Sequence, residues 1–84
     1  MKAKIQEIIK KSNSQKEAVL NHLKEFGSID AMNALNNYGA YRLSDIILKL
    51  RRDGFEIQTE MIPHVSHFGE KGKFARYNYS QLNK

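Results

Sequence analysis

Residues 39–54 read GAYRLSDIILKLRRDG, a short segment that begins and ends with glycine. Four apolar residues in it recur at the i, i+3, i+4 and i+7 spacing of one helical face, and Gly54 follows where a residue in the left-handed conformation would end the helix. The pattern predicts a helix over residues 42–53 that is apolar on one side. Its apolar face consists of Leu43, Ile46, Ile47 and Leu50. The opposite face is polar and mostly basic and carries Arg42, Ser44, Asp45, Lys49 and Arg52.

A longer amphipathic segment lies on the amino-terminal side. Ser14 and Glu17 have the spacing of a capping box, in which each side chain accepts a hydrogen bond from a free backbone N–H of the first helical turn. Apolar residues then recur as far as Gly27, and glycine commonly ends helices. His22 falls among the polar positions, so we expect a surface histidine there. Residues 14–27 are therefore predicted to contain a capped helix that buries one face.

A shorter helix is predicted between these two. Ser28-Ile29 is long enough only for a strand fragment, and Asp30 is well placed as the N-cap of a helix over residues 31–37. Tyr38-Gly39 then requires a tight turn before residues 42–53. Two helices joined by a few residues that include glycine are typical of a helix-turn-helix, and the second of them would carry the cationic face.

The carboxy-terminal part has the pattern of a β-hairpin. Residues 55–61 alternate apolar and polar with a period of two, which predicts a half-buried strand. Residues 63–73 contain the only proline and two glycines and are predicted to be a loop or a distorted hairpin tip, after which strand character resumes at residues 74–79. The hairpin tip is therefore expected to project from the domain. The half-buried face of the first strand would consist of Phe55, Ile57, Thr59 and Met61.

The predicted order of helices and strands is that of a winged helix-turn-helix, an α+β fold with a three-helix core and a carboxy-terminal β-hairpin wing. We expect this domain to span residues 14–79, with residues 80–84 as a tail. Residues 1–13 are predicted to be a basic arm or short helix that packs weakly on the domain. A dimer contact through the arm's isoleucines and an arm lying on phosphate are two alternatives that the sequence leaves open.

Composition limits the possible functions. A chain of 84 residues is long enough for one modest core. It has no cysteine and three scattered histidines, so we expect no metal site, and we expect no cofactor. No apolar run approaches the length of a membrane span, which favours a cytoplasmic protein without a membrane partner. The formal net charge of +5 points to an anionic partner, and the positive charge gathers in the arm, in residues 42–53 and in the last segment.

The major groove of DNA admits one α-helix, whose first residues reach the base edges. Arg42 is expected to bind guanine or phosphate, or alternatively to pair with an acidic neighbour and stabilise the turn. Ala40 or Tyr41 would contact a thymine methyl group, and Ser44 a base or a phosphate. Asp45 is expected to orient a side chain or to exclude a wrong base, because phosphate would repel it.

Further cations would bind the DNA backbone. Lys49 and Arg52 are expected to neutralise phosphates one or two helical turns later. In the wing, Lys71, Lys73 and Arg76 are expected to follow the backbone or enter the minor groove, where the negative potential is enhanced. A solvated loop whose charge only aids solubility is the alternative. His64 and His67 are weaker wing candidates, and with Phe68 they would also suit a protein contact.

The central segment resembles small helix-turn-helix domains of bacteriophages and prophages. In those domains a Gly-x-x-Arg-Leu-x-x-x-Ile-x-x-Leu-Arg-x-x-Gly pattern precedes the wing, and residues 39–54 match it. Residues 29–35 and 74–77 are also similar to that family, so the resemblance covers roughly residues 14–79. It implies a winged-helix fold and binding to double-stranded DNA.

These observations together predict a sequence-specific DNA-binding protein, most simply a transcriptional regulator of a phage or prophage in the bacterial cytoplasm. A recombination accessory factor of the excisionase kind is a second DNA-binding role. The alternative is a protein-binding winged-helix module, such as a viral inhibitor of a host nuclease or defence complex, for which exposure of Leu48 would argue. A monomer would read few base pairs, which favours a homodimer or a bent multi-protein complex. Glu56, Glu60, Tyr77 and Tyr79 would suit a protein interface. No catalytic arrangement is recognisable, so an enzyme is not expected.

Overall fold

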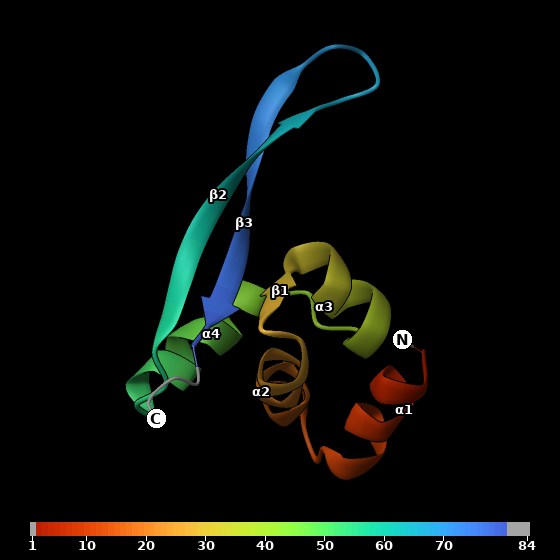
Figure 1. Cartoon of the computed structure of the whole chain (residues 1–84), viewed down its shortest axis with the longest axis vertical. Coiled ribbons are helices and arrows are strands. Elements are labelled where there is room, and N and C mark those ends of the chain that lie inside the picture. Colours follow the sequence, from red (N-terminus) through yellow and green to blue (C-terminus); the bar gives the residue numbers. More distant parts are fainter. Residues whose placement is uncertain (1, 81–84) are drawn as a thin grey trace.

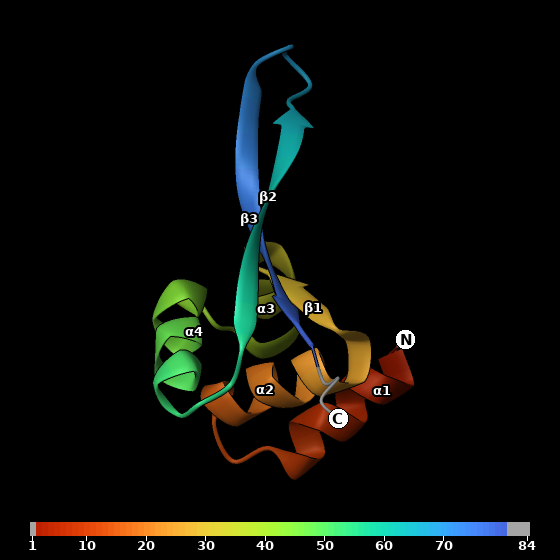
Figure 2. The same cartoon turned by 60° about the vertical axis from the view of Figure 1, so that its left-hand side comes forward.

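The computed structural model describes residues 2–80 as a body of four helices from which a long β-hairpin projects (Figure 1). The strands form one antiparallel sheet in the order β1-β3-β2, so β3 lies between the short β1 and the edge strand β2. The turned view shows α4 on one side of the hairpin base and β1 on the other (Figure 2). The elements are α1 (Lys2–Lys11), α2 (Gln15–Phe26), β1 (Ser28–Asp30), α3 (Ala31–Tyr38), α4 (Leu43–Arg52), β2 (Ile57–Val65) and β3 (Lys71–Tyr79).

The predicted caps fix where the helices begin and end. Ser14 Oγ accepts a hydrogen bond from the Glu17 N–H at 3.2 Å, and Asp30 and Asn33 form a reciprocal capping box at the start of α3. Gly39 ends α3 with φ of 67°, a backbone conformation in which a side chain would be strained. Gly54, with φ of 106°, follows α4 in the same region of φ, as the sequence predicted.

One core lies between the helices and the base of the sheet. The apolar face predicted for α4 is confirmed, since its four residues are at most 9% exposed. They pack with Val19 and Leu23 of α2, Ile29 of β1 and Ile57 of β2 in a single cluster. This burial supplies the main driving force for placing α4 against the sheet.

The amino-terminal segment packs more firmly than the sequence suggested. Residues 2–11 form the predicted helix, but Ile8 is only 2% exposed, so the expectation of a weakly packed arm is wrong. Lys4 Nζ lies 3.0 Å from Glu25 Oε2 of α2, and Asn21 of α2 donates to Ser12 Oγ at 3.0 Å. The apolar contact and these polar bonds hold α1 against α2.

His22 is buried, contrary to the expectation of a surface histidine. Its residue is 5% exposed, its ring lies against Phe26, and its Nδ1 is 2.6 Å from the Tyr38 hydroxyl. α3 covers this side of α2, and a helical pattern read from α2 alone does not reveal that cover. Burial lowers the pKa of His22, partly opposed by Asp30, and burial raises the pKa of Tyr38 to about 12.

The wing is longer and its loop shorter than predicted. β2 and β3 stay paired as far as Val65 and Lys71, so the tip comprises residues 66–70 rather than 63–73. Pro63 is accommodated because β2 is an edge strand, where one missing N–H is tolerated. Of the face expected to be half-buried, Ile57 is buried and Phe55 partly buried, whereas Thr59 and Met61 are exposed. The strand leaves the body after its first residues.

Candidate nucleic-acid interface

Two polar contacts fix α4 at its carboxy-terminal end. The Arg51 guanidinium donates to the Ile57 carbonyl oxygen at 2.7 and 2.9 Å and to Thr59 Oγ1 at 2.8 Å, which attaches α4 to β2. Lys16 Nζ of α2 lies 2.6 Å from Asp53 Oδ2 just after α4. Arg51 is not among the functional residues predicted from the sequence, although its place four residues after the buried Ile47, at the border of the apolar face, was an available signal. α4 and the wing are therefore joined by core packing and by this guanidinium.

The outward face of α4 is exposed as predicted. Ser44, Asp45, Lys49 and Arg52 all lie on the surface. Leu48, which is 48% exposed, lies among them, so this face is not purely polar. α4 thus presents two cations of its last two turns beside one apolar side chain.

The first turn of α4 carries an exposed ion pair. Arg42 Nε lies 2.9 Å from Asp45 Oδ2, so Asp45 orients the arginine as the sequence analysis expected. The Arg42 side chain is nevertheless 82% exposed, which leaves most of the guanidinium accessible. Arg42 is also the N-cap of α4, and it makes no side-chain hydrogen bond to the first N–H groups of the helix. The start of α4 therefore keeps the partial positive charge of uncapped amides.

Ala40 and Tyr41 are placed differently from each other. Ala40 is 1% exposed and its N–H donates to the Ala34 carbonyl oxygen at 3.1 Å, so the expectation that it contacts a base is wrong. The turn folds inward at this residue, and the small side chain belongs to the same buried cluster as Ala34 of α3 and Leu43 of α4. Tyr41 is 85% exposed and remains available to a partner.

The strand register divides the wing into two faces. Residues directly paired across a sheet share a face, and successive residues alternate. Lys71 pairs with Val65 and Lys73 with Pro63, which places both lysines on the face that, at the wing base, carries the buried Ile57. This face turns toward the core and α4. Both lysines are exposed.

Arg76 lies on the opposite face, which corrects its assignment to the basic wing surface. Its Nη2 is 3.2 Å from Glu60 Oε1, and Asn78 Nδ2 donates to the same oxygen at 3.0 Å. Hydrogen bonds from Asn78 and Arg76 lower the pKa of Glu60. The ion pair joins β2 to β3 and neutralises a carboxylate that the sequence had indicated for a protein interface.

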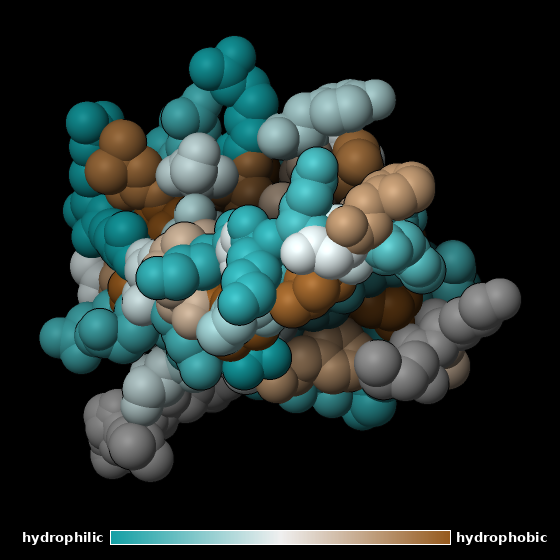
Figure 3. All heavy atoms as spheres, turned by 90° about the horizontal axis from the view of Figure 1, so that it is seen from above, coloured by the Kyte–Doolittle hydropathy of each residue, from teal (hydrophilic) through white to brown (hydrophobic). Residues whose placement is uncertain are grey.

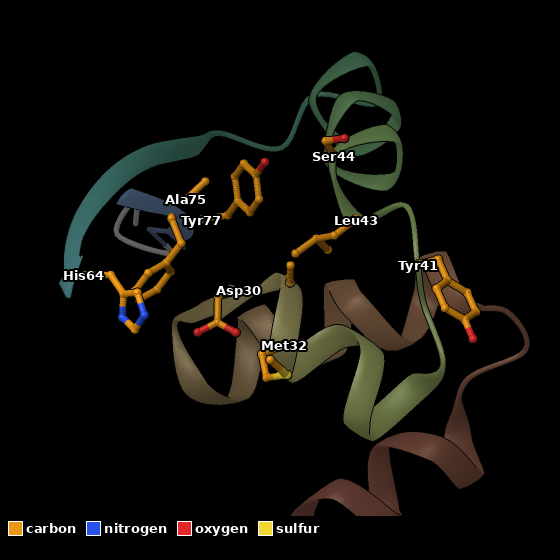
Figure 4. A pocket seen from close by; sticks show the side chains of 10 residues that line it. Asp30, Met32, Tyr41, Leu43, Ser44, His64, Ala75 and Tyr77 are labelled. Carbon is orange, nitrogen blue, oxygen red and sulfur yellow. The ribbon is translucent and has the colours of Figure 1, made fainter. Parts of the chain in front are cut away.

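A groove of about 580 Å³ separates the wing from the starts of α3 and α4. Figure 4 shows side chains from these three parts of the chain around it, with Ser44 on α4, Met32 on α3 and Tyr77 on β3. His64 and Phe74 line it from the wing, with ring centroids 6.2 Å apart. Seen from above, apolar side chains in brown reach the surface beside the polar side chains of the wing (Figure 3). The groove is a mixed, partly aromatic surface between the two basic elements.

Metal ions and membranes are two other classes of partner. Within residues 2–80, no three histidine, aspartate or glutamate side chains gather in a way that would hold a metal ion. None of the helices in this same part combines the length and the apolarity that a membrane span requires.

Comparison with known proteins agrees with this geometry. A family model described as a winged helix-turn-helix domain matches residues 14–80. A search of curated proteins found no matching sequence. The matched region contains α2, the helix-turn-helix of α3 and α4, and the complete wing, whereas α1 lies outside it.

Proposed function

The chain belongs to the winged helix-turn-helix family, a class of DNA-binding modules that are typically not enzymes, and from this we propose that it binds double-stranded DNA sequence-specifically. One observation carries the proposal. α4 presents the exposed cations Lys49 and Arg52 at the base of the hairpin, and the hairpin carries the exposed Lys71 and Lys73 together on one face of β3. An α-helix with exposed cations beside a basic hairpin suits a major groove and the adjacent backbone.

The residues have separable roles in this proposal. Arg42, oriented by Asp45, reads a guanine or binds the phosphate beside it, and Ser44 contacts a base or a phosphate. Tyr41 packs against a thymine methyl group. The cations that neutralise phosphate are Lys49, Arg52, Lys71 and Lys73.

The resemblance of residues 39–54 to phage and prophage domains supports a finer role. We propose a transcriptional regulator that acts in the cytoplasm of a bacterial host, with an accessory role in recombination as the other DNA-directed option. A single α4 reads few base pairs, so a homodimer or a larger protein assembly on DNA would complete the site.

Salt-dependent binding to a duplex tests the proposal. The logarithm of the affinity should fall linearly with the logarithm of salt concentration, with a slope of about −0.9 for each phosphate contact. Lys71→Ala should reduce the magnitude of the slope by about 0.9 and weaken all sequences alike. Lys10→Ala on α1 is the control, and its slope should equal that of the unmodified protein. Absence of binding to any duplex at low salt would overturn the proposal.

Arg42→Ala tests sequence reading separately. Loss of a bidentate arginine–guanine contact removes about 1–3 kcal/mol of discrimination between bases, so sequence preference should relax more than total affinity falls. Binding measured on two duplexes that differ at one guanine gives this discrimination directly. If Arg42→Ala instead unfolds the domain, the Arg42–Asp45 pair has a structural role.

Exposed apolar residues favour one second candidate, a protein-binding module. Leu48 is 48% exposed on the outward face of α4 and Met32 is 64% exposed at the start of α3. Methionine is enriched at protein interfaces, and a partner that covered the outward face of α4 would bury Leu48 as well. A protein that binds no duplex, but whose complex with a protein partner is disrupted by Leu48→Glu, would support this candidate.

A further inference from the structure

The wing ends in an ordered turn. Ser66 Oγ accepts hydrogen bonds from the N–H groups of Phe68 at 3.2 Å and Glu70 at 3.1 Å. The Ser66 N–H donates to the Glu70 carbonyl oxygen at 2.8 Å, and the Gly69 N–H donates to the Ser66 carbonyl oxygen at 3.0 Å. Gly69 has φ of 82°, which lets the chain reverse in so few residues. Four hydrogen bonds to one serine therefore hold the backbone of residues 66–70.

This turn presents a phenyl ring to solvent. Phe68 is 91% exposed, the highest value among the large apolar residues of the described chain, and Val65 beside the turn is 61% exposed. The ring contributes nothing to the core, which lies at the other end of the hairpin. An aromatic side chain held outward by an ordered backbone loses little conformational entropy when it inserts into a partner.

The wing is built to carry this ring away from the body. β1 supports β3 only as far as the pair Asp30–Arg76, so the pairs from Met61–Ala75 to Val65–Lys71 form a free two-stranded ribbon. The undistorted minor groove of DNA is about 6 Å wide, so a ribbon whose strands lie about 4.8 Å apart before side chains are added enters it only where the groove widens. The turn leads the ribbon and is the part of the wing that reaches the groove floor first.

Charge beside the turn suits DNA. Lys71 and Lys73 follow the turn on one face of β3. Residues 61–75 contain one carboxylate, that of Glu70, so the two lysines leave this part of the wing with a net positive charge. Two lysines spaced along one strand can bind the phosphates that border a minor groove while the turn enters it. A phenyl ring makes no hydrogen bond to the base edges on the groove floor, so its favourable position in DNA is between base pairs, stacked.

We propose that Phe68 is a wedge that inserts between two base pairs from the minor groove and bends the duplex, a mechanism that rests on the proposed DNA binding. Insertion unstacks one base step and kinks DNA toward the major groove, which brings more of the duplex against the protein. Pyrimidine–purine steps unstack most easily. The preferred site should therefore contain a TA or CA/TG step beneath the wing, flanking the base pairs that α4 contacts in the major groove.

The bend is measured with a duplex of about 25 base pairs that carries a donor dye at one end and an acceptor at the other. The unmodified protein should raise energy transfer at saturation, by an amount that corresponds to a bend of about 20–90°. Phe68→Ala should abolish the rise at saturation. Phe74→Ala is the matched control, because it removes the other exposed phenyl of the wing from the opposite face; it should leave the bend intact. Lys71→Ala should weaken binding but retain the bend once the duplex is saturated.

A second measurement observes the ring itself. The chain has no tryptophan, so Phe68→Trp introduces a single reporter. Stacking between bases should quench its fluorescence on binding. A duplex with a flexible two-base bulge at the wing position should bind the unmodified protein at least about tenfold more tightly than the intact duplex, and Phe68→Ala should lose this preference.

The outcomes separate the two proposals. A duplex that is bound but not bent, or is bent equally by Phe68→Ala, overturns the wedge and leaves DNA binding standing. Unquenched Phe68→Trp in a bound complex also overturns the wedge. Absence of binding to every duplex overturns the wedge together with the proposed function.

Discussion

Replacing Arg51 with methionine should loosen the attachment of α4 to the wing without removing a DNA contact. The guanidinium makes three hydrogen bonds, two to the Ile57 carbonyl oxygen and one to Thr59 Oγ1, at 2.7–2.9 Å. Methionine keeps most of the aliphatic stem and removes every donor, so the change isolates the polar contact.

The magnitude follows from these bonds and from their exposure. A hydrogen bond that involves a charged group contributes about 1.5–3 kcal/mol, and a neutral one about 0.5–1.5 kcal/mol. Arg51 is exposed, two of its bonds share one oxygen, and water replaces the lost donors at an edge strand. We therefore expect Arg51→Met to lower the free energy of unfolding by about 1–2 kcal/mol, and Thr59→Val by about 0.5–1 kcal/mol.

Urea unfolding at 25 °C measures the change, with the urea dependence of the free energy expected to stay constant. In thermal unfolding the midpoint should fall by about 4–8 °C for each kcal/mol in a domain of this size. Arg52→Met is the matched control. Its side chain is exposed and, within residues 2–80, makes no hydrogen bond or ion pair. This control should alter stability by less than about 0.5 kcal/mol.

On binding to a duplex, Arg52→Met should have the larger effect and Arg51→Met the smaller. Arg52→Met should reduce the magnitude of the salt slope by about 0.9, whereas Arg51→Met should leave it unchanged. Equal losses of stability from the two variants would refute the role given to Arg51. A salt slope reduced by Arg51→Met would show that this guanidinium binds phosphate instead of β2.

Three further predictions concern stability. Burial lowers the pKa of His22 below its ordinary value of 6.5, so as the pH falls the unfolded chain takes up the proton before the folded chain does. The contribution of His22 to the free energy of unfolding should be fully present above pH 6.5 and should fall toward pH 5, by at most about 1.4 kcal/mol per pH unit. Urea unfolding at several pH values measures this slope, which His22→Gln should lack. Leu50→Ala should lower the free energy of unfolding by about 2–5 kcal/mol, whereas the exposed Leu48→Ala should change it by less than about 0.5 kcal/mol, both by urea unfolding. Gly39→Ala should destabilise by about 1 kcal/mol or more because of its positive φ, whereas thermal unfolding of Gly72→Ala should show little loss.

The proposed DNA surface was only partly visible in the sequence. Arg42, Lys49, Arg52, Lys71 and Lys73 lie at the surface, as their polar surroundings predicted. Ala40 and Arg76 were predicted to contact DNA from their neighbours in the chain, but the folded chain places neither of them on the proposed DNA surface. The turn before α4 buries Ala40, whose N–H donates to the Ala34 carbonyl oxygen. The Arg76 guanidinium forms an ion pair with Glu60 on the neighbouring strand. Both errors arise because a motif fixes the order of residues but does not fix which of them the fold covers.

The helices, their ends and the apolar face of α4 follow from the amino-acid sequence alone. These features depend on residues three or four apart and on the positive φ that glycine permits at Gly39 and Gly54. A short stretch of sequence is therefore enough to predict them. Three other features appear only in the folded chain: α3 covers His22, Arg51 joins α4 to β2, and the wing strands extend to a five-residue tip bearing Phe68. Each of these depends on the packing of separate elements or on strand register, and local periodicity contains neither.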